Sequence, residues 1–370
     1  MTEMQKGRIQ LLLAGMATFF LMGALQAVYG PALPVIARET GRAVADVSIL
    51  FTVHWVGSAA GVATMFALGR RMTPRLLVAV MALGAVLLGL GWGWPVTLLG
   101  ASLAGFGQGC AAVVFNPRLL ALFGRRGPAM LSMINAIFGA GAILAPLAFV
   151  MMGGAYGLVF LAVGVALLIV AAGAQDVGRP PVETSAAPLR ADWAILAFGA
   201  FGIGFEAVLI GLGPSALVRN GYSEAAAAEF LSAFFMAFLL ARTVLTFAAH
   251  RIAPFTLYAL SITGVAVSML LALVLPPGWP FVAAGAFASL IFPAYFVEGM
   301  ARMGHGPRVS PLIIAGGLVG GIGMPFVLAR VAEVMGPNGL FLLLAGLASA
   351  TAVVALIVLI QRSGARTATP

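Results

Sequence analysis

Residues 193–213 read WAILAFGAFGIGFEAVLIGLG and place a single carboxylate, Glu206, in the middle of an apolar stretch. The nearest charged residues along the chain are Asp192, 14 positions before it, and Arg219, 13 positions after it. A helix rises about 1.5 Å per residue, so both charges lie roughly 20 Å from Glu206 along the axis. The stretch is long enough to cross a bilayer, and Glu206 falls near its middle.

A buried acid at this depth is costly unless it is protonated or paired, which leaves two interpretations of Glu206. In the functional interpretation, Glu206 takes up and releases a proton, because desolvation favours the protonated carboxyl group. In the structural interpretation, its side chain forms a hydrogen bond to a neighbouring helix. The residues around it favour the first and indicate transport.

The composition extends the membrane prediction to the whole chain. Of its 370 residues, 62% are hydrophobic and 8% are charged, and the mean hydropathy is +1.09. Soluble domains are about 45–50% apolar and about 25% charged. A water-soluble fold cannot cover this much apolar surface, so we expect a polytopic membrane protein.

The apolar segments of spanning length number about twelve, six on each side of a polar, proline-rich segment. The first six are residues 9–29, 46–69, 74–92, 96–122, 128–152 and 156–174. The second six are residues 193–213, 226–249, 254–275, 279–299, 309–329 and 338–361. We therefore expect an all-α membrane protein with one six-helix bundle over 1–174, a cytoplasmic linker over 175–192 and a second six-helix bundle over 193–370.

The basic residues indicate the orientation in the membrane. On the side of the N-terminus and the linker fall 14 of them: Lys6, Arg8, Arg70, Arg71, Arg75, Arg125, Arg126, Arg179, Arg190, Arg251, Arg302, Arg308, Arg362 and Arg366. Only four fall opposite: Arg38, Arg42, Arg219 and Arg330. Positive charge accumulates in cytoplasmic loops, so both termini should be cytoplasmic in a bacterial-type inner membrane. The N-terminal residues show no signal-peptide cleavage site, and the first apolar segment should be the first span.

Several other functions are excluded because the sequence lacks the residues or patterns that they need. The arginines lie in short loops between spans, which argues against a nucleic-acid partner despite the net charge of +9. A single cysteine, Cys110, excludes an internal disulfide and a multi-cysteine metal site. The sequence contains no Walker A motif, metal-ligand cluster or nucleophile motif. We expect no enzyme, no cofactor and no metal, and a monomer whose partners are a small solute, a coupling proton and the bilayer.

The two halves of the chain repeat each other. Five matches occur in order with offsets of 179–185 residues: Gly30-Pro31 with Gly213-Pro214, Arg71 with Arg251, Trp94-Pro95 with Trp279-Pro280, Gly127-Pro128 with Gly306-Pro307, and Pro146 with Pro325. An even number of spans per half makes the repeats parallel, related by an axis along the membrane normal. A solute path between the halves is the physical consequence.

Two stretches carry a resemblance to a known family. Residues 107–146, GQGCAAVVFNPRLLALFGRRGPAMLSMINAIFGAGAILAP, and residues 204–244, GFEAVLIGLGPSALVRNGYSEAAAAEFLSAFFMAFLLARTV, resemble spans four and five and spans seven and eight of the major facilitator superfamily. The similarity is to its fucose-permease-like and related sugar-transporter branches. The resemblance implies a solute cavity lined by spans one, four, seven and ten, and transport by alternating access.

The chain departs from the family's motifs in two places. The basic loop of the family reads G-x-x-x-D-R-x-G-R-R, and residues 66–75 read FALGRRMTPR, which lacks the acid. This puts the gating charge pair that the acid supports in doubt. The drug-antiporter signature ends in G-x-x-x-G-P-x-x-G-G, and residues 141–150 read GAILAPLAFV without the closing glycines. A drug–proton exchanger is therefore not supported.

The candidate solute-binding residues are polar or aromatic side chains inside the expected spans: Gln26, Tyr29, Phe51, His54, Trp55, Gln108, Asn135, Glu206 and Tyr295. The amides and hydroxyls suit a hydroxyl-rich solute, although helix–helix hydrogen bonds would use the same groups. Phe51 and Trp55, within one turn of His54, either stack on a sugar ring or pack against neighbouring helices. The repeat offset and the cavity of the resembled family would place Gln26 and Glu206 facing each other.

Proton coupling is assigned to Glu206, with His54 as a second candidate. An unperturbed histidine titrates at pH about 6.5, so His54 could relay protons or bind solute. The alternative is a neutral histidine held by a backbone carbonyl. Gating is assigned to charges near the cytoplasmic side: Arg70, Arg71, Arg118, Arg242 and Glu298. An Arg118–Glu298 gate competes with an ordinary helical pair between Glu298 and Arg302, four residues apart.

Together these features predict a secondary active transporter that works by alternating access. The first expectation is proton-coupled uptake of a small polar organic solute, with a sugar-like molecule as the first candidate. An exporter of drug-like or metabolite molecules is the alternative within the same class. A transport-inactive receptor or assembly factor that keeps the fold is the alternative from another class.

Overall fold

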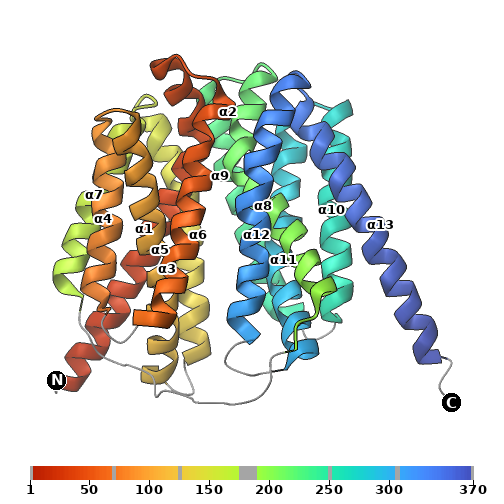
Figure 1. The fold of residues 1–370 in the computed structure, drawn as a ribbon, viewed down its shortest axis with the longest axis horizontal. Helices are drawn as coiled ribbons and strands as arrows, with labels where there is room; N and C mark the ends of the chain where they lie inside the picture. The colour runs from red at the N-terminus through yellow and green to blue at the C-terminus, as the bar shows by residue number, and fades with distance from the viewer. Residues whose placement is uncertain are drawn as a thin grey trace. The chain divides into compact units, whose positions relative to one another are not determined.

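A computed structural model describes residues 3–68, 72–123, 127–174, 190–248, 252–304 and 309–367. The regular structure in these residues is entirely helical, which confirms the expected fold class (Figure 1). The chain divides into two compact units, Met1–Val182 and Glu183–Pro370. Of the expected linker, residues 175–189 lie outside the described residues.

Unit 1 contains six long helices and one short one within its described residues. They are α1 (Glu3–Thr40), α2 (Val44–Val47), α3 (Ile49–Leu68), α4 (Pro74–Leu90), α5 (Trp94–Phe123), α6 (Gly127–Met151) and α7 (Tyr156–Gly173). The main packing partners are α1 with α6, α3 with α5, and α4 with both α5 and α7. Helix α5 therefore lies between α3 and α4 in the packing order.

Unit 2 contains six long helices in its described part. They are α8 (Trp193–Arg219), α9 (Glu224–Ala248), α10 (Pro254–Val274), α11 (Gly278–Met303), α12 (Val309–Val334) and α13 (Gly339–Thr367). Helix α8 packs with α12, α9 with α11, and α10 with both α11 and α13. This repeats the pairing of unit 1 helix for helix, as the proline and glycine matches of the sequence predict.

Ten described segments have the length and hydropathy of a membrane span. They belong to every long helix except α4 and α6, of which Pro74–Leu90 and Ala136–Met151 form shorter apolar helices. The loops between helices contain glycines in the left-handed region; Gly91, for example, ends α4 with φ 61°. A residue without a side chain adopts that conformation at no steric cost.

The helices of the first and seventh spans continue through a proline, past the expected ends of those spans. The sequence predicts that the first and seventh spans end at Tyr29 and Gly213, before a proline, whereas α1 continues to Thr40 and α8 to Arg219. The residues after each proline are buried, as Leu33 and Leu217 show, so packing stabilises the additional turns. Neighbouring helices and local adjustment compensate for the hydrogen bond that proline cannot donate.

Glycines allow the helices of each unit to approach closely. A Cβ atom at Gly141 of α6 would overlap with the carbonyl oxygen of Phe20 of α1, and one at Gly23 of α1 would overlap with that of Phe138 of α6. In unit 2, a Cβ atom at Gly320 of α12 would overlap with the carbonyl oxygen of Ala200 of α8. Small residues at such contacts are a main source of helix association in lipid, where burial of apolar surface drives little.

We expect Gly320→Ala to lower the stability of the protein by about 1–3 kcal/mol, because the added methyl group forces α12 away from α8. The measurement is the midpoint of thermal unfolding of purified protein in detergent. Gly323→Ala on the same helix is the matched control, since an added Cβ there meets no heavy atom within 4 Å. Equal shifts for the two variants would contradict the close-approach account.

Candidate functional site

Unit 1 contains a buried chain of hydrogen bonds made of four residues that the sequence singles out. The Tyr29 hydroxyl lies 3.3 Å from Nδ1 of His54, and Nε2 of His54 lies 3.2 Å from Oε1 of Gln108. Nε2 of Gln108 donates to Oε1 of Gln26 at 3.3 Å. The four side chains come from α1, α3 and α5, and none is more than 7% exposed.

One tautomer of His54 satisfies every bond in this chain. The amide oxygen of Gln108 can only accept, so Nε2 of His54 carries the hydrogen and Nδ1 accepts from the Tyr29 hydroxyl. A neutral imidazole is therefore complete in this arrangement. The ring nitrogens of His54 contact the side chains of Tyr29 and Gln108 rather than a backbone carbonyl.

Aromatic rings enclose the tyrosine and histidine of the chain. Tyr29 meets Phe51 edge-on at 6.2 Å and Phe160 of α7 at 5.4 Å, between ring centroids. Trp55 meets His54 at 6.0 Å with the rings nearly perpendicular. The indole N–H of Trp55 is buried and has no hydrogen-bond partner within the described residues. A buried donor of this kind favours a polar ligand atom nearby.

The contact between α3 and α5 brings His54 and Gln108 together. A Cβ atom at Gly105 would overlap with the carbonyl oxygen of His54, and one at Gly109 would overlap with that of Ser58. These two glycines flank Gln108 by three residues and one residue, so the backbones touch where the amide reaches the imidazole. The sequence contains a signal for this contact, because glycines recur around the polar residue Gln108 on α5.

Glu206 lies at the centre of α8, thirteen residues from each end of the helix. Its Oε2 atom is buried and has no hydrogen-bond partner in the described part of the chain. The charge that acts on it comes from Arg242 of α9, which attracts the carboxylate. Glu206 is isolated along the sequence, but a cation from the adjacent helix compensates its charge in space.

Arg242 is held by two further contacts in unit 2. Its Nε atom donates to the carbonyl oxygen of Ser289 on α11 at 3.2 Å, and its guanidinium carbon lies 4.8 Å from the centre of the Phe238 ring. These contacts direct it inside the unit, beside Glu206. The sequence places Arg242 among the gating charges, and the structure adds an electrostatic role that spacing alone does not indicate.

Tyr295 occupies a packed position on α11. Its hydroxyl donates to the carbonyl oxygen of Ile313 on α12 at 2.5 Å, and the side chain is fully buried. A Cβ atom at Gly199 of α8 would overlap with its ring. The ring therefore fills a space created by a missing side chain, and its hydroxyl is satisfied without a solute.

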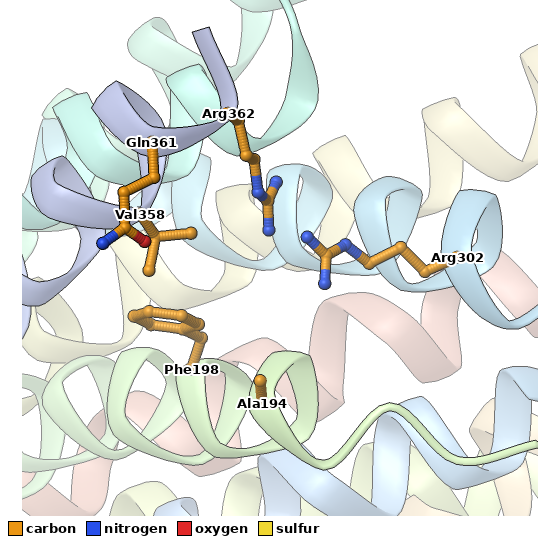
Figure 2. Close-up of a pocket in the computed structure, with 6 residues that line it drawn as sticks. All are labelled: Ala194, Phe198, Arg302, Val358, Gln361 and Arg362. Atoms are coloured by element: carbon orange, nitrogen blue, oxygen red, sulfur yellow. The ribbon is translucent and has the colours of Figure 1, made fainter. Parts of the chain in front are cut away.

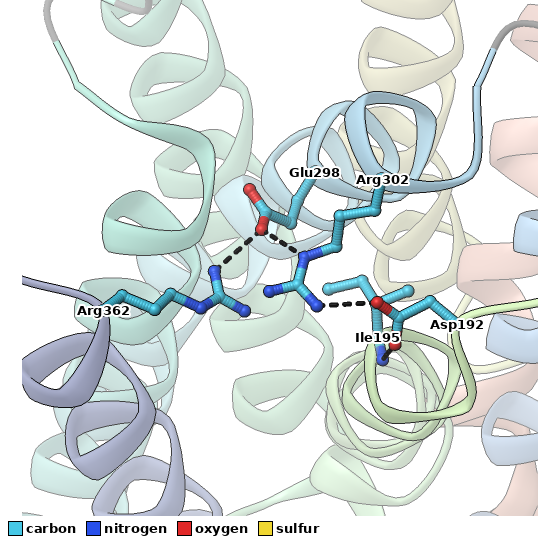
Figure 3. Close-up of polar contacts among 5 residues, drawn as sticks. All are labelled: Asp192, Ile195, Glu298, Arg302 and Arg362. Atoms are coloured by element: carbon cyan, nitrogen blue, oxygen red, sulfur yellow. Dashed lines mark hydrogen bonds and ion pairs between the residues drawn. The ribbon is translucent and has the colours of Figure 1, made fainter. Parts of the chain in front are cut away.

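Glu298 belongs to a network of charges within unit 2 (Figure 3). Its Oε1 atom accepts from Nε of Arg302 at 2.7 Å and from Nη1 of Arg362 at 2.8 Å. Nη1 of Arg302 also bonds Oδ2 of Asp192 at 2.7 Å. The helical pair with Arg302, expected from the spacing, is therefore present, and it is joined by Asp192, which precedes α8, and by Arg362 of α13.

Asp192 has a second role at the start of α8, where Oδ1 accepts from the backbone N–H of Ile195 at 3.1 Å. Partial burial opposes ionisation of this carboxyl group, but the hydrogen bonds from Arg302 and Ile195 outweigh it and lower the pKa of Asp192. Asp192 thus ties the cap of one helix to the end of another. Sequence reasoning used Asp192 only as a boundary marker of the span.

The remaining candidates are placed less fully. Arg118 is buried on α5, with 4% of its surface exposed. Asn135 lies on α6, but its side chain is outside the described residues. Arg70 and Arg71 also lie outside them. The Arg118–Glu298 gate would need one residue from each unit, so it stays a prediction.

Comparison with known families matches residues 15–310 to the model of the Major Facilitator Superfamily. The chain belongs to the Major Facilitator Superfamily. Members of this superfamily are membrane transporters and not enzymes, as the sequence predicts. No curated protein matches the chain.

Solved structures of this superfamily share the fold along nearly the whole chain. The nucleoside transporter NupG is 14% identical, with a TM-score of 0.74, and the match covers 96% of this chain and 99% of NupG. A D-xylose-proton symporter is 11% identical, with a TM-score of 0.75, over 94% and 97%. The E. coli fucose:proton symporter FucP is 16% identical, with a TM-score of 0.64, over 95% and 99%. At these identities the likeness concerns the fold.

We expect Tyr29→Phe to destabilise this superfamily member by about 0.5–1.5 kcal/mol, because His54 loses its buried donor while the aromatic packing is kept. The measurement is the midpoint of thermal unfolding. Tyr156→Phe is the matched control, because its hydroxyl donates to Glu39 at 3.0 Å at an exposed position. Strictly additive losses in a Tyr29→Phe, His54→Leu double variant would show that the two side chains do not stabilise each other.

Proposed function

We propose that this transporter carries out proton-coupled uptake of a small polar organic solute, with a sugar-like molecule as the first candidate. The observation that carries the proposal is the buried polar chain from Tyr29 to Gln26, next to aromatic rings. An apolar membrane helix bundle does not need four hydrogen-bonding side chains in one place for packing alone. Amides, a hydroxyl and aromatic faces together match a hydroxyl-rich ligand.

The fold neighbours support this solute class. Two of them are named as symporters of protons with a sugar, D-xylose or fucose, and a third as a nucleoside transporter, whose solutes also contain a sugar. In the proposal, Gln26 and Gln108 bind solute hydroxyls, Phe51 and Trp55 contact the ring, and Tyr29 and His54 hold the amides in place. Asn135 and Tyr295 stay predicted solute contacts, although the Tyr295 hydroxyl already donates to the carbonyl oxygen of Ile313 in this structure.

Glu206 is the proposed proton carrier. Its Oε2 atom is buried without a hydrogen-bond donor among the described residues, and the positive charge of Arg242 comes from the adjacent helix α9. In the proposal, a change in the packing of α8 against α9 accompanies uptake and release of the proton. His54 is the second candidate relay, since it connects Tyr29 to Gln108 through both ring nitrogens.

The proposal includes a sidedness. The excess of arginines at one end of the helices favours a cytoplasmic location of both termini in a bacterial-type inner membrane. The proposal also takes the transporter to act as a monomer. By chain order Arg70, Arg71, Arg118, Arg242 and Glu298 belong to that end, and they are the proposed gating residues. Alternating access then exposes the solute site first to the outside and afterwards to the cytoplasm.

Reconstitution in liposomes tests this function. A thermal-shift screen of purified protein against a solute library first identifies a ligand, because binding stabilises the folded state by mass action. Adding that solute outside the liposomes should then make the external medium more alkaline as protons enter with it. Drug sensitivity of a deletion strain without an uptake defect would indicate an exporter. A stable protein partner with no solute flux would indicate a transport-inactive receptor.

We expect Glu206→Gln to abolish accumulation of solute against its gradient while leaving solute binding and exchange intact, because the amide cannot release a proton. The measurement is uptake of labelled solute with and without an imposed pH gradient. Glu229→Gln serves as the control, since this acid lies at the exposed start of α9 and should leave uptake unchanged. Normal proton-driven accumulation by Glu206→Gln would remove the coupling role.

A further inference from the structure

A pocket of unit 2 has none of the residues proposed for the solute or the proton in its lining. It has a volume of about 360 Å³ and is lined by Ala194 and Phe198 of α8, Arg302 of α11, and Val358, Gln361 and Arg362 of α13 (Figure 2). Helix α8 begins here, and α11 and α13 end here. The pocket is therefore at one end of the helix bundle, where a membrane protein meets the lipid headgroups.

The two arginines point toward each other across the pocket (Figure 2). Both donate to the same oxygen, Oε1 of Glu298, and Arg302 also bonds Asp192. One face of the Arg362 guanidinium lies on the Phe255 ring, 3.9 Å from its centre. These contacts keep the two like charges close together in fixed orientations before any ligand binds.

The arginines retain hydrogen-bond donors after these contacts are counted. Among the described residues, Nε and Nη1 of Arg302 and Nη1 of Arg362 have acceptors, whereas Nη2 of both groups and Nε of Arg362 do not. Their side chains are 29% and 31% exposed, so a ligand can reach them. A phosphate group offers several charged oxygens to two adjacent guanidinium forks, which bind it with charge-assisted hydrogen bonds.

The charges at this end of the unit also favour an anion. The two acids, Asp192 and Glu298, balance the two arginines, Arg302 and Arg362, so the net charge of these four groups is zero. Arg190 and Arg366 belong to the same end by chain order and add positive charge. An approaching anion therefore meets a net positive surface, whereas the acids inside the network are already bonded to arginine.

Apart from Gln361, the remaining lining is apolar and suits a hydrocarbon chain. Phe198 and Val358 face the pocket beside the arginines, and the small Ala194 lies on α8 near Phe198 (Figure 2). The neighbouring surface of α13 exposes large apolar side chains, Ile357 at 49% and Ile360 at 70%. Such a surface contacts acyl chains in a bilayer. A charged head and an apolar tail next to each other describe an amphiphile rather than a soluble anion.

We propose that this pocket binds the phosphate headgroup of an anionic phospholipid, with Arg302 and Arg362 on the phosphate and Phe198 and Val358 on the first part of an acyl chain. Basic pockets between helix ends recognise anionic headgroups in this way. The bound lipid would contact three helices: α8 through Phe198, α11 through Arg302 and α13 through Arg362. Glu298 already bridges the two arginines, and Asp192 bonds Arg302. Solute and proton take no part in this binding.

The test is lipid binding by the purified full-length protein, measured by native mass spectrometry and by the rise in the thermal midpoint. The probes are phosphatidylglycerol, phosphatidylcholine with the same acyl chains, and inorganic phosphate. Arg362→Gln removes one phosphate ligand and leaves the Arg302 pairs with Glu298 and Asp192 intact. Arg330→Gln is the matched control, because it removes the same charge at the other end of unit 2, where Arg330 stacks on Phe326.

We expect phosphatidylglycerol to bind the wild type about tenfold more tightly than Arg362→Gln, and Arg330→Gln to bind it like the wild type. Val358→Trp, which fills the pocket without a change of charge, should lose binding as well and decides the question if Arg362→Gln does not fold. Equal losses in Arg362→Gln and Arg330→Gln would overturn the site. Equal binding of phosphatidylcholine, or of inorganic phosphate alone, would overturn the assignment to an anionic lipid.

Discussion

The close approach of α3 and α5 at Gly105 and Gly109 is the constraint on which the polar centre of unit 1 depends. In hydrocarbon a polar side chain needs a partner from the protein, because water cannot supply one. Gln108 reaches His54 only because no side chains separate the two backbones there. The same contact type places α1 on α6 and α8 on α12, so small residues determine the arrangement of each unit.

Much of the fold follows from the sequence, because the signals are strong and local. The six-plus-six organisation follows from the apolar segments, and the repeat from prolines and glycines at a near-constant offset. The helices of the first and seventh spans continue through Pro31 and Pro214, past the approximate ends that the sequence predicts. Burial of the turns after them, which depends on neighbouring helices, is not visible in a local pattern.

The candidate site was predictable in part, and the limit is again the distance along the chain. Gln26, Tyr29, His54 and Gln108 stand out as polar residues in apolar spans, but their connection depends on how three helices pack. Arg242 beside Glu206 and Arg362 on Glu298 are likewise contacts between helices far apart in sequence. By contrast, the Glu298–Arg302 pair follows from a four-residue spacing alone.

The hydrogen bonds of the unit 1 chain run in a single direction, from the Tyr29 hydroxyl to the Gln26 oxygen. The chain therefore ends in unlike groups: the Tyr29 oxygen keeps lone pairs at one end, and the Gln26 amide keeps its N–H groups at the other. If the proposed solute binds at the Gln26 end, these N–H groups require an acceptor from it, such as a ring oxygen or a carbonyl. Reversing that preference requires the imidazole proton to move to the other nitrogen and both amides to rotate together.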